Sequence, residues 1–109
     1  MTTMPSDSDR LTKLRALLAA EPEDGFLLYG LAQELHKLGR TDEAVEHYDR
    51  AIAVDPKECY AFFHKAKALE DAGRVDAARE ALRLGLARAR SVGDRKAASE
   101  IEGYLDQLE

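Results

Sequence analysis

The sequence predicts an all-α fold, an α-solenoid built from antiparallel helix hairpins, with about six helices. The first observation is an internal repeat: LGRTDEAVEHY at 38–48 returns as AGRVDAAREAL at 72–82, 34 residues later. The second is composition, because Ala, Leu, Glu, Arg and Lys dominate the chain and are strong helix formers. Only three prolines and seven glycines interrupt the 109 residues, so helices joined by short turns are expected.

The repeat divides the middle of the chain into two units, 25–58 and 59–92, each expected to form a helix pair. In the first unit Leu28, Leu31 and Leu35 recur at the spacing of one buried helix face. Aligning the units gives eight identities: Ala32/Ala66, Leu35/Leu69, Gly39/Gly73, Arg40/Arg74, Asp42/Asp76, Ala44/Ala78, Glu46/Glu80 and Ala53/Ala87.

Turn residues predict where these helices end and begin. Gly39 and Gly73 stand where a left-handed residue would close the first helix of each unit. Thr41 is expected to cap the next helix, whereas Val75 offers no such cap in the second unit. Asp55-Pro56 is expected to end the second helix of the first unit, since proline disfavours a helical conformation before it.

The two flanks predict further helices. Residues 1–9 are expected to be a disordered lead, and 10–21 to be the second helix of a partial preceding unit. Its apolar face is expected to consist of Leu11, Leu14, Leu17 and Leu18. Gly93-Asp94 supplies a turn and a cap before a C-terminal capping helix at 94–108. Its expected buried residues are Ala97, Ile101, Tyr104, Leu105 and Leu108.

The units resemble the tetratricopeptide repeat (TPR) family, and the whole chain resembles a small single-domain TPR protein. The first unit matches the family signature at Leu28, Leu31-Ala32, Leu35, Ala44, Tyr48, Ala51 and Pro56. The second unit keeps Phe62, Ala66, Leu69 and Ala78 but departs at Lys65, Leu82, Gly85 and Arg90. The resemblance implies a right-handed arc of helix pairs, a TPR superhelix, whose concave surface usually binds peptides.

A second stripe on the first helix of each unit is the candidate functional surface. Its positions are three and four residues apart and fall on a different helix face from the leucines. The resemblance implies that this stripe lines the concave groove. The predicted peptide-binding residues are Phe26, Tyr29, Gln33, His36, Lys37, Tyr60, Phe63, His64 and Lys67.

Other roles for these rings stay open at this point. Phe26 and Tyr60 would pack against the preceding helix, or the terminal helix would fold over Phe63. The function predicted from the sequence is a non-catalytic protein–protein interaction module, an adaptor or scaffold that holds a partner peptide or protein segment in the groove. The alternative is a homo-oligomeric structural protein that associates through the aromatic groove or the exposed terminal helices.

Charge and hydropathy exclude several other classes. The net charge of −5 argues against general nucleic-acid binding, which requires cations facing phosphates. The basic segment 79–96 reads as a solvated helix face beside an acidic final helix, with a phosphate contact as the alternative. No apolar run is long enough to span a membrane, and no signal peptide is visible, so a cytoplasmic location is expected.

Catalytic and metal motifs are sparse. His36, His47 and His64 are isolated from one another in sequence, and Cys59 is the single cysteine, so neither a metal site nor a cofactor is predicted. Some family members grip a C-terminal carboxylate with lysine and asparagine residues. This chain has Tyr29, Gln33 and His64 at the matching places, so that clamp is not expected. An enzyme is not predicted.

Overall fold

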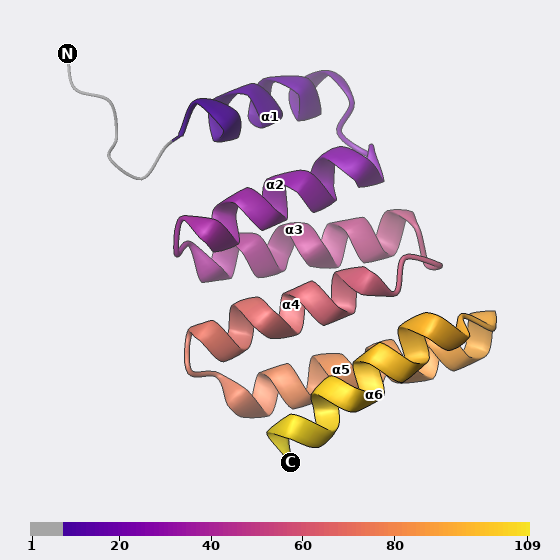
Figure 1. Cartoon of the computed structure of the whole chain (residues 1–109). Coiled ribbons are helices and arrows are strands. Elements are labelled where there is room, and N and C mark those ends of the chain that lie inside the picture. The colour runs from indigo at the N-terminus through magenta and orange to yellow at the C-terminus, as the bar shows by residue number, and fades with distance from the viewer. Residues whose placement is uncertain (1–7) are drawn as a thin grey trace.

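The computed structural model describes residues 8–109, and over that range the chain forms six α-helices and no strand. The helices are α1 (Asp9–Ala20), α2 (Gly25–Lys37), α3 (Thr41–Val54), α4 (Tyr60–Asp71), α5 (Val75–Val92) and α6 (Arg95–Leu108). Figure 1 shows them alternating in direction, and each helix packs against the next along the chain. The predicted all-α stack of antiparallel hairpins is therefore confirmed.

The expected disordered lead at 1–9 lies mostly outside the described residues, but Asp9 is the first residue of α1. Ser8 is the N-cap of α1, and its Oγ accepts a hydrogen bond from the Leu11 amide at 3.0 Å. The same hydroxyl donates to the buried carboxylate of Glu34 at 2.8 Å, and Arg10 lies 3.3 Å from the other Glu34 oxygen. Capping and pairing together fix the start of α1 against α2.

Three glycines close helices as the sequence predicts. Gly39, Gly73 and Gly93 have φ of 78°, 78° and 76°. At the first of them the Gly39 amide donates to His36 O and the Arg40 amide to Leu35 O, both at 2.9 Å, which is the Schellman pattern. The other two turns repeat this pattern, so the chain reverses direction through the same geometry three times.

The expected cap of α3 is wrong, whereas α5 lacks a side-chain cap, as expected from Val75. Thr41 is the first helical residue of α3, and the N-cap position belongs to Arg40, which makes no side-chain capping bond. Arg74 holds the same position at the start of α5, again without a side-chain cap. Because the Schellman turn uses the glycine and the arginine after it, the next helix begins one residue earlier than the Thr41 cap required. Asp94 does cap α6 as predicted, accepting from the Ala97 amide at 3.0 Å.

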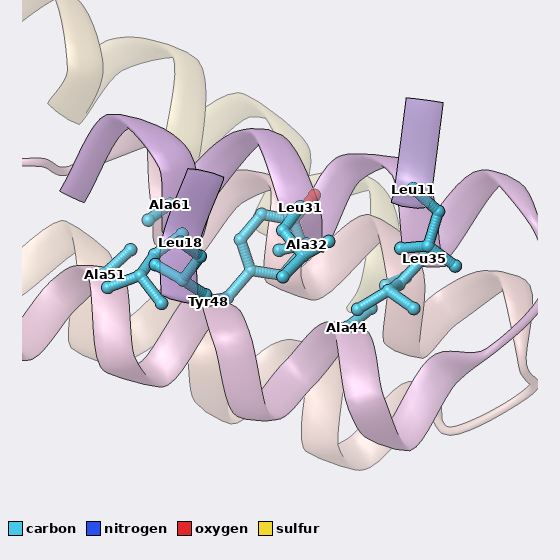
Figure 2. Packing of buried hydrophobic residues seen from close by; sticks show 11 residues of the cluster. Leu11, Leu18, Leu31, Ala32, Leu35, Ala44, Tyr48, Ala51 and Ala61 are labelled. Carbon is cyan, nitrogen blue, oxygen red and sulfur yellow. The ribbon is translucent and has the colours of Figure 1, made fainter. Parts of the chain in front are cut away.

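The core consists of two clusters along the stack. The first joins α1, α2 and α3 with Ala61 and Ala68 of α4, and Figure 2 shows the fully buried Tyr48 ring beside Leu31 and Ala32. The second joins α4, α5 and α6 around Ala66, Leu82 and Ile101. Small alanines at the helix contacts let neighbouring helices approach closely, so each hairpin buries its leucines against the next.

Candidate functional site

Aromatic rings from α2 and α4 form a connected strip where these two helices lie against each other. The ring of Tyr29 on α2 lies 5.7 Å, centroid to centroid, from the ring of His64 on α4. His64 is 5.5 Å from Phe63, and Phe63 is 6.4 Å from Tyr60. All three pairs meet edge to face, an arrangement that adds to the stability of aromatic contacts. We call these four residues the ring strip; each is half-buried.

A hollow of ≈ 480 Å³ lies at the Tyr29 end of the ring strip. Phe26 and Tyr29 of α2 line it together with Ala51 and Val54 of α3, and Asp55 and Glu58 of the α3–α4 connection stand at its edge. Phe26 is 87% exposed. The expectation that Phe26 packs against the preceding helix is therefore wrong. We call this feature the Phe26 hollow.

A second hollow, between α4 and α6, adjoins the strip at Phe63. Its lining includes Phe63, Lys67 and Glu70 of α4 and Tyr104 of α6. The Phe63 and Tyr104 rings are 5.2 Å apart, and the Lys67 ammonium lies 5.3 Å from the centroid of each. The Tyr104 hydroxyl donates a hydrogen bond to the Glu70 carboxylate. The final helix thus covers one side of Phe63, as one of the alternatives anticipated, and leaves the ring half-buried.

The remaining predicted site residues are dispersed around the strip. Gln33 and Lys37 are exposed on α2. His36, near the end of α2, lies 2.6 Å from the Asp71 carboxylate at the end of α4 and so links the two helices. This pairing occupies His36, and no cluster of three or more potential metal ligands occurs among residues 8–109.

Burial shapes the electrostatics of the strip. Desolvation, with smaller effects from Lys67 and His36, lowers the pKa of the His64 imidazole from its ordinary value. Desolvation, followed by the charge of Glu58, raises the pKa of the Tyr29 phenol. Both side chains are therefore neutral near pH 7, and the strip presents apolar rings with hydrogen-bonding edges.

Sequence reasoning placed Tyr104 in the core and did not include it in the site. It is indeed buried, but its ring also forms one wall of the second hollow. The sequence did contain a signal for this role. Tyr104 lies at the edge of the apolar face of α6, and a side chain at such an edge contacts both the core and the surface.

Cys59 is a buried core residue. Its side chain is almost fully covered, and its Sγ lies 3.6 Å from the carbonyl oxygen of Lys57. Desolvation raises the pKa of the thiol, which opposes the thiolate form that reactive cysteines need.

Three arginines of α5 form hydrogen bonds with α6 and with the residue that follows it. Arg79 donates to the Leu108 carbonyl at 2.8 Å, and Arg90 to the Glu102 carboxylate at 3.1 Å. Arg83 reaches Glu109 at 2.9 Å. These contacts pair the basic segment with α6, the acidic neighbour that the sequence indicated. Between residues 8 and 109, no helix combines the length and the apolar character that crossing a bilayer demands.

Comparison with known proteins identifies the repeat. The family model described as tetratricopeptide repeat matches residues 26–58. The TPR repeat-containing protein PA0015 of Pseudomonas aeruginosa is 32% identical over 96 residues, which cover 88% of this chain and 91% of that protein. The chain belongs to the TPR family.

Solved structures share the TPR fold of this chain. The solution structure of protein BPP2914 from Bordetella parapertussis matches with a TM-score of 0.77 and 28% identity, over 94% of this chain and 89% of that one. The crystal structure of PcrH in complex with the chaperone binding region of PopD matches with a TM-score of 0.80 and 21% identity, over 90% and 74%. TPR proteins are generally non-enzymatic protein-interaction modules, and this is the class in which the fold places the chain.

Proposed function

We propose that this TPR protein is an adaptor that holds a short segment of a partner protein across the ring strip. The observation that carries the proposal is the strip itself: half-exposed rings in mutual contact, running between a hollow at Tyr29 and a hollow at Phe63. Large rigid rings contribute much contact area and lose little side-chain entropy when a partner covers them. Gln33, Lys37 and Lys67 supply polar contacts beside the rings.

The strength of such binding follows from opposing terms. Covering the exposed parts of several rings removes apolar surface from water at about 25 cal/mol per Å². Ordering a flexible partner segment and losing its overall freedom of motion offset much of that gain. A dissociation constant of roughly micromolar size is therefore expected.

A structural relative supports this placement by analogy. PcrH, whose fold is similar, has been crystallised with a region of another protein, PopD. A stack of helices with a similar fold is thus able to hold a segment of another protein. The partner of the present chain is expected to be a protein or peptide rather than a nucleic acid or a membrane, given the net charge of −5.

The test is titration of the partner segment, found by affinity capture from the native cell extract, against Tyr29→Ala and Phe63→Ala. Each substitution should weaken binding by at least about 1 kcal/mol, close to fivefold, because each removes a contact ring. Leu84→Ala is the matched control, since Leu84 is 52% exposed on α5 and lines neither hollow. Thermal melts of each variant show whether the fold is retained. Unchanged affinity in both ring variants contradicts the proposal.

Self-association is the second candidate. Helix α1 ends the described stack and contacts α2, and its Leu17 is 55% exposed. The terminal helix of a stacked array normally has a polar outer face, so an exposed leucine there offers a contact for another copy. Light scattering after gel filtration measures this directly: a monomer at high micromolar concentration excludes the second candidate, whereas a dimer that Leu17→Asp dissociates supports it.

A further inference from the structure

The Phe26 hollow combines an apolar wall with an acidic rim. Phe26 is the most exposed large apolar side chain of the described residues, and Val54 beside it is 40% exposed. Leaving two such groups in water costs apolar transfer free energy that a bound apolar group would recover. The volume, ≈ 480 Å³, lies within the range of about 300–1,000 Å³ typical of ligand pockets.

The rim is acidic and fixed in place. Of the described residues that line the hollow, Asp55 and Glu58 are acidic and none is basic. Asp55 Oδ1 accepts from the Lys57 amide at 3.1 Å, and Glu58 Oε1 accepts from the Tyr60 amide at 3.0 Å. Each carboxylate is thus oriented by one of its oxygens, which limits the entropy lost when a cation binds to the other.

The connection that carries these carboxylates is itself anchored to α5. Arg88 donates to the Pro56 carbonyl at 2.7 Å, and its guanidinium lies 5.9 Å from the Phe62 ring centroid. A rim held in this way provides a preformed site for charge recognition.

The second unit lacks the same combination. The positions 34 residues after Val54, Asp55 and Glu58 are Arg88, Ala89 and Val92. Both acids are therefore absent there, and a base stands in place of Val54. The acidic hollow is a property of the first unit of this chain, and the repeat alone does not produce it.

From this geometry we propose that the Phe26 hollow selects partner segments that carry a large apolar side chain with a Lys or Arg within two residues of it.

 The apolar side chain fills the space between Phe26 and Val54, and the cation reaches Asp55 and Glu58. This rests on the proposed function, because Tyr29 belongs both to this hollow and to the ring strip. Lys and Arg suit such a place, since their aliphatic stems cover aromatic surface while their charged ends remain at a polar rim.

The probe is an array of synthetic twelve-residue peptides in a Gly/Ser/Ala host, in which two positions, two residues apart, vary over all amino acids. The protein is labelled at its N-terminal amine. It should bind peptides with Leu, Ile or Phe at one varied position and Lys or Arg at the other about tenfold more strongly than the same peptides with Glu in place of the basic residue. That preference should weaken as salt is raised, because salt screens charges at an exposed rim. Equal or better binding of the acidic peptides overturns the proposal.

Variants assign the preference to named side chains. Phe26→Ala should lower the affinity for the best peptide about fivefold or more, and folding should be retained because the ring is 87% exposed. The double variant Asp55→Asn/Glu58→Gln keeps the acceptor oxygens for the backbone amides and should remove the preference for basic peptides. Leu84→Ala and Glu46→Gln, on other exposed surfaces, are the matched controls and should change neither quantity.

The outcomes separate this inference from the proposed function. If Tyr29→Ala and Phe63→Ala abolish peptide binding while Phe26→Ala and the double carboxylate variant have no effect, the ring strip is the site and the hollow inference is overturned. If no array peptide binds at 1 mM concentration (~10³-fold above the roughly micromolar constant expected), the hollow inference is also overturned, and titration with the native partner decides the proposed function. A dimer that Phe26→Ala dissociates assigns the hollow to a second copy and overturns selection of a partner peptide.

Discussion

Gly85 of α5 lies directly against the Phe62 side chain of α4. A Cβ built on Gly85 would lie 2.5 Å from Phe62 Cβ, a distance that real Cβ atoms essentially never show, and 3.0 Å from Phe62 Cγ. In the first unit the corresponding residues, 34 positions earlier, are Ala51 and Leu28. The second unit thus has a larger residue on one helix and a smaller one on the other, and the two departures from the repeat compensate.

Gly85→Ala is therefore expected to lower the free energy of unfolding by about 1–3 kcal/mol through overpacking. Helix propensity acts in the opposite direction, favouring Ala by roughly 0.8–1 kcal/mol, so a net loss shows that the contact dominates. Adding Phe62→Leu, which recreates the pair of the first unit, should recover much of the loss. Urea unfolding of both single variants and the double variant measures the coupling. Additive effects would contradict the compensation.

The Schellman turns make a separate prediction. Gly39→Ala should destabilise the protein by about 1–2 kcal/mol, because φ at this residue is 78° and L-residues with a Cβ resist that conformation. Gly103→Ala is the matched control: Gly103 lies within α6, and a Cβ there would meet no atom within 4 Å. That change should stabilise by up to about 1 kcal/mol. Thermal melts showing the same sign for both glycines would refute the difference in backbone geometry.

Tyr48 offers a test of polar burial. Its ring is fully buried in the first cluster, and its hydroxyl has no hydrogen-bond partner among the described residues. A buried hydroxyl without a partner costs about 1–3 kcal/mol, so Tyr48→Phe should leave stability unchanged or raise it by about 1 kcal/mol. Equilibrium unfolding in urea measures this change. A loss greater than about 1 kcal/mol would indicate that the hydroxyl is bonded.

His64 predicts a pH dependence of stability. Burial lowers the pKa of its imidazole in the folded state, so the unfolded state binds protons more readily near and below about pH 6.5. The free energy of unfolding should therefore fall as the pH is lowered from 7.5 to 5.5. His64→Gln should make that fall shallower. Parallel pH profiles for wild type and His64→Gln would show that His64 is not the group responsible.

Much of this fold is predictable because the relevant signals are local. The leucine spacing of α2 and the glycines at 39, 73 and 93 act within one helix or one turn, and the structure contains them as expected. The Thr41 cap failed because the Schellman turn leaves no residue between Arg40 and the next helix. Ser8 was missed because its role depends on Glu34, a residue 26 positions away.

The contribution of α6 to the site was not predictable from the repeat. The residues 34 positions after Phe62, Ala66 and Leu69 are Lys96, Glu100 and Gly103, all exposed. Their neighbours Ala97, Ile101 and Tyr104 are buried instead, so α6 is shifted by one residue relative to the period. That shift brings the Tyr104 ring to Phe63 and follows from packing against α5, which a repeat alignment does not contain.

The most direct measurement of the central claim is chemical-shift mapping of the protein labelled with nitrogen-15, titrated with the captured partner segment. The ring strip account predicts that the largest amide shifts fall around Tyr29 on α2 and around Phe63 and His64 on α4. It also predicts that residues around Leu84 on α5 remain unperturbed. Shifts confined to α5 or to the outer face of α1, with the ring strip unchanged, would contradict it.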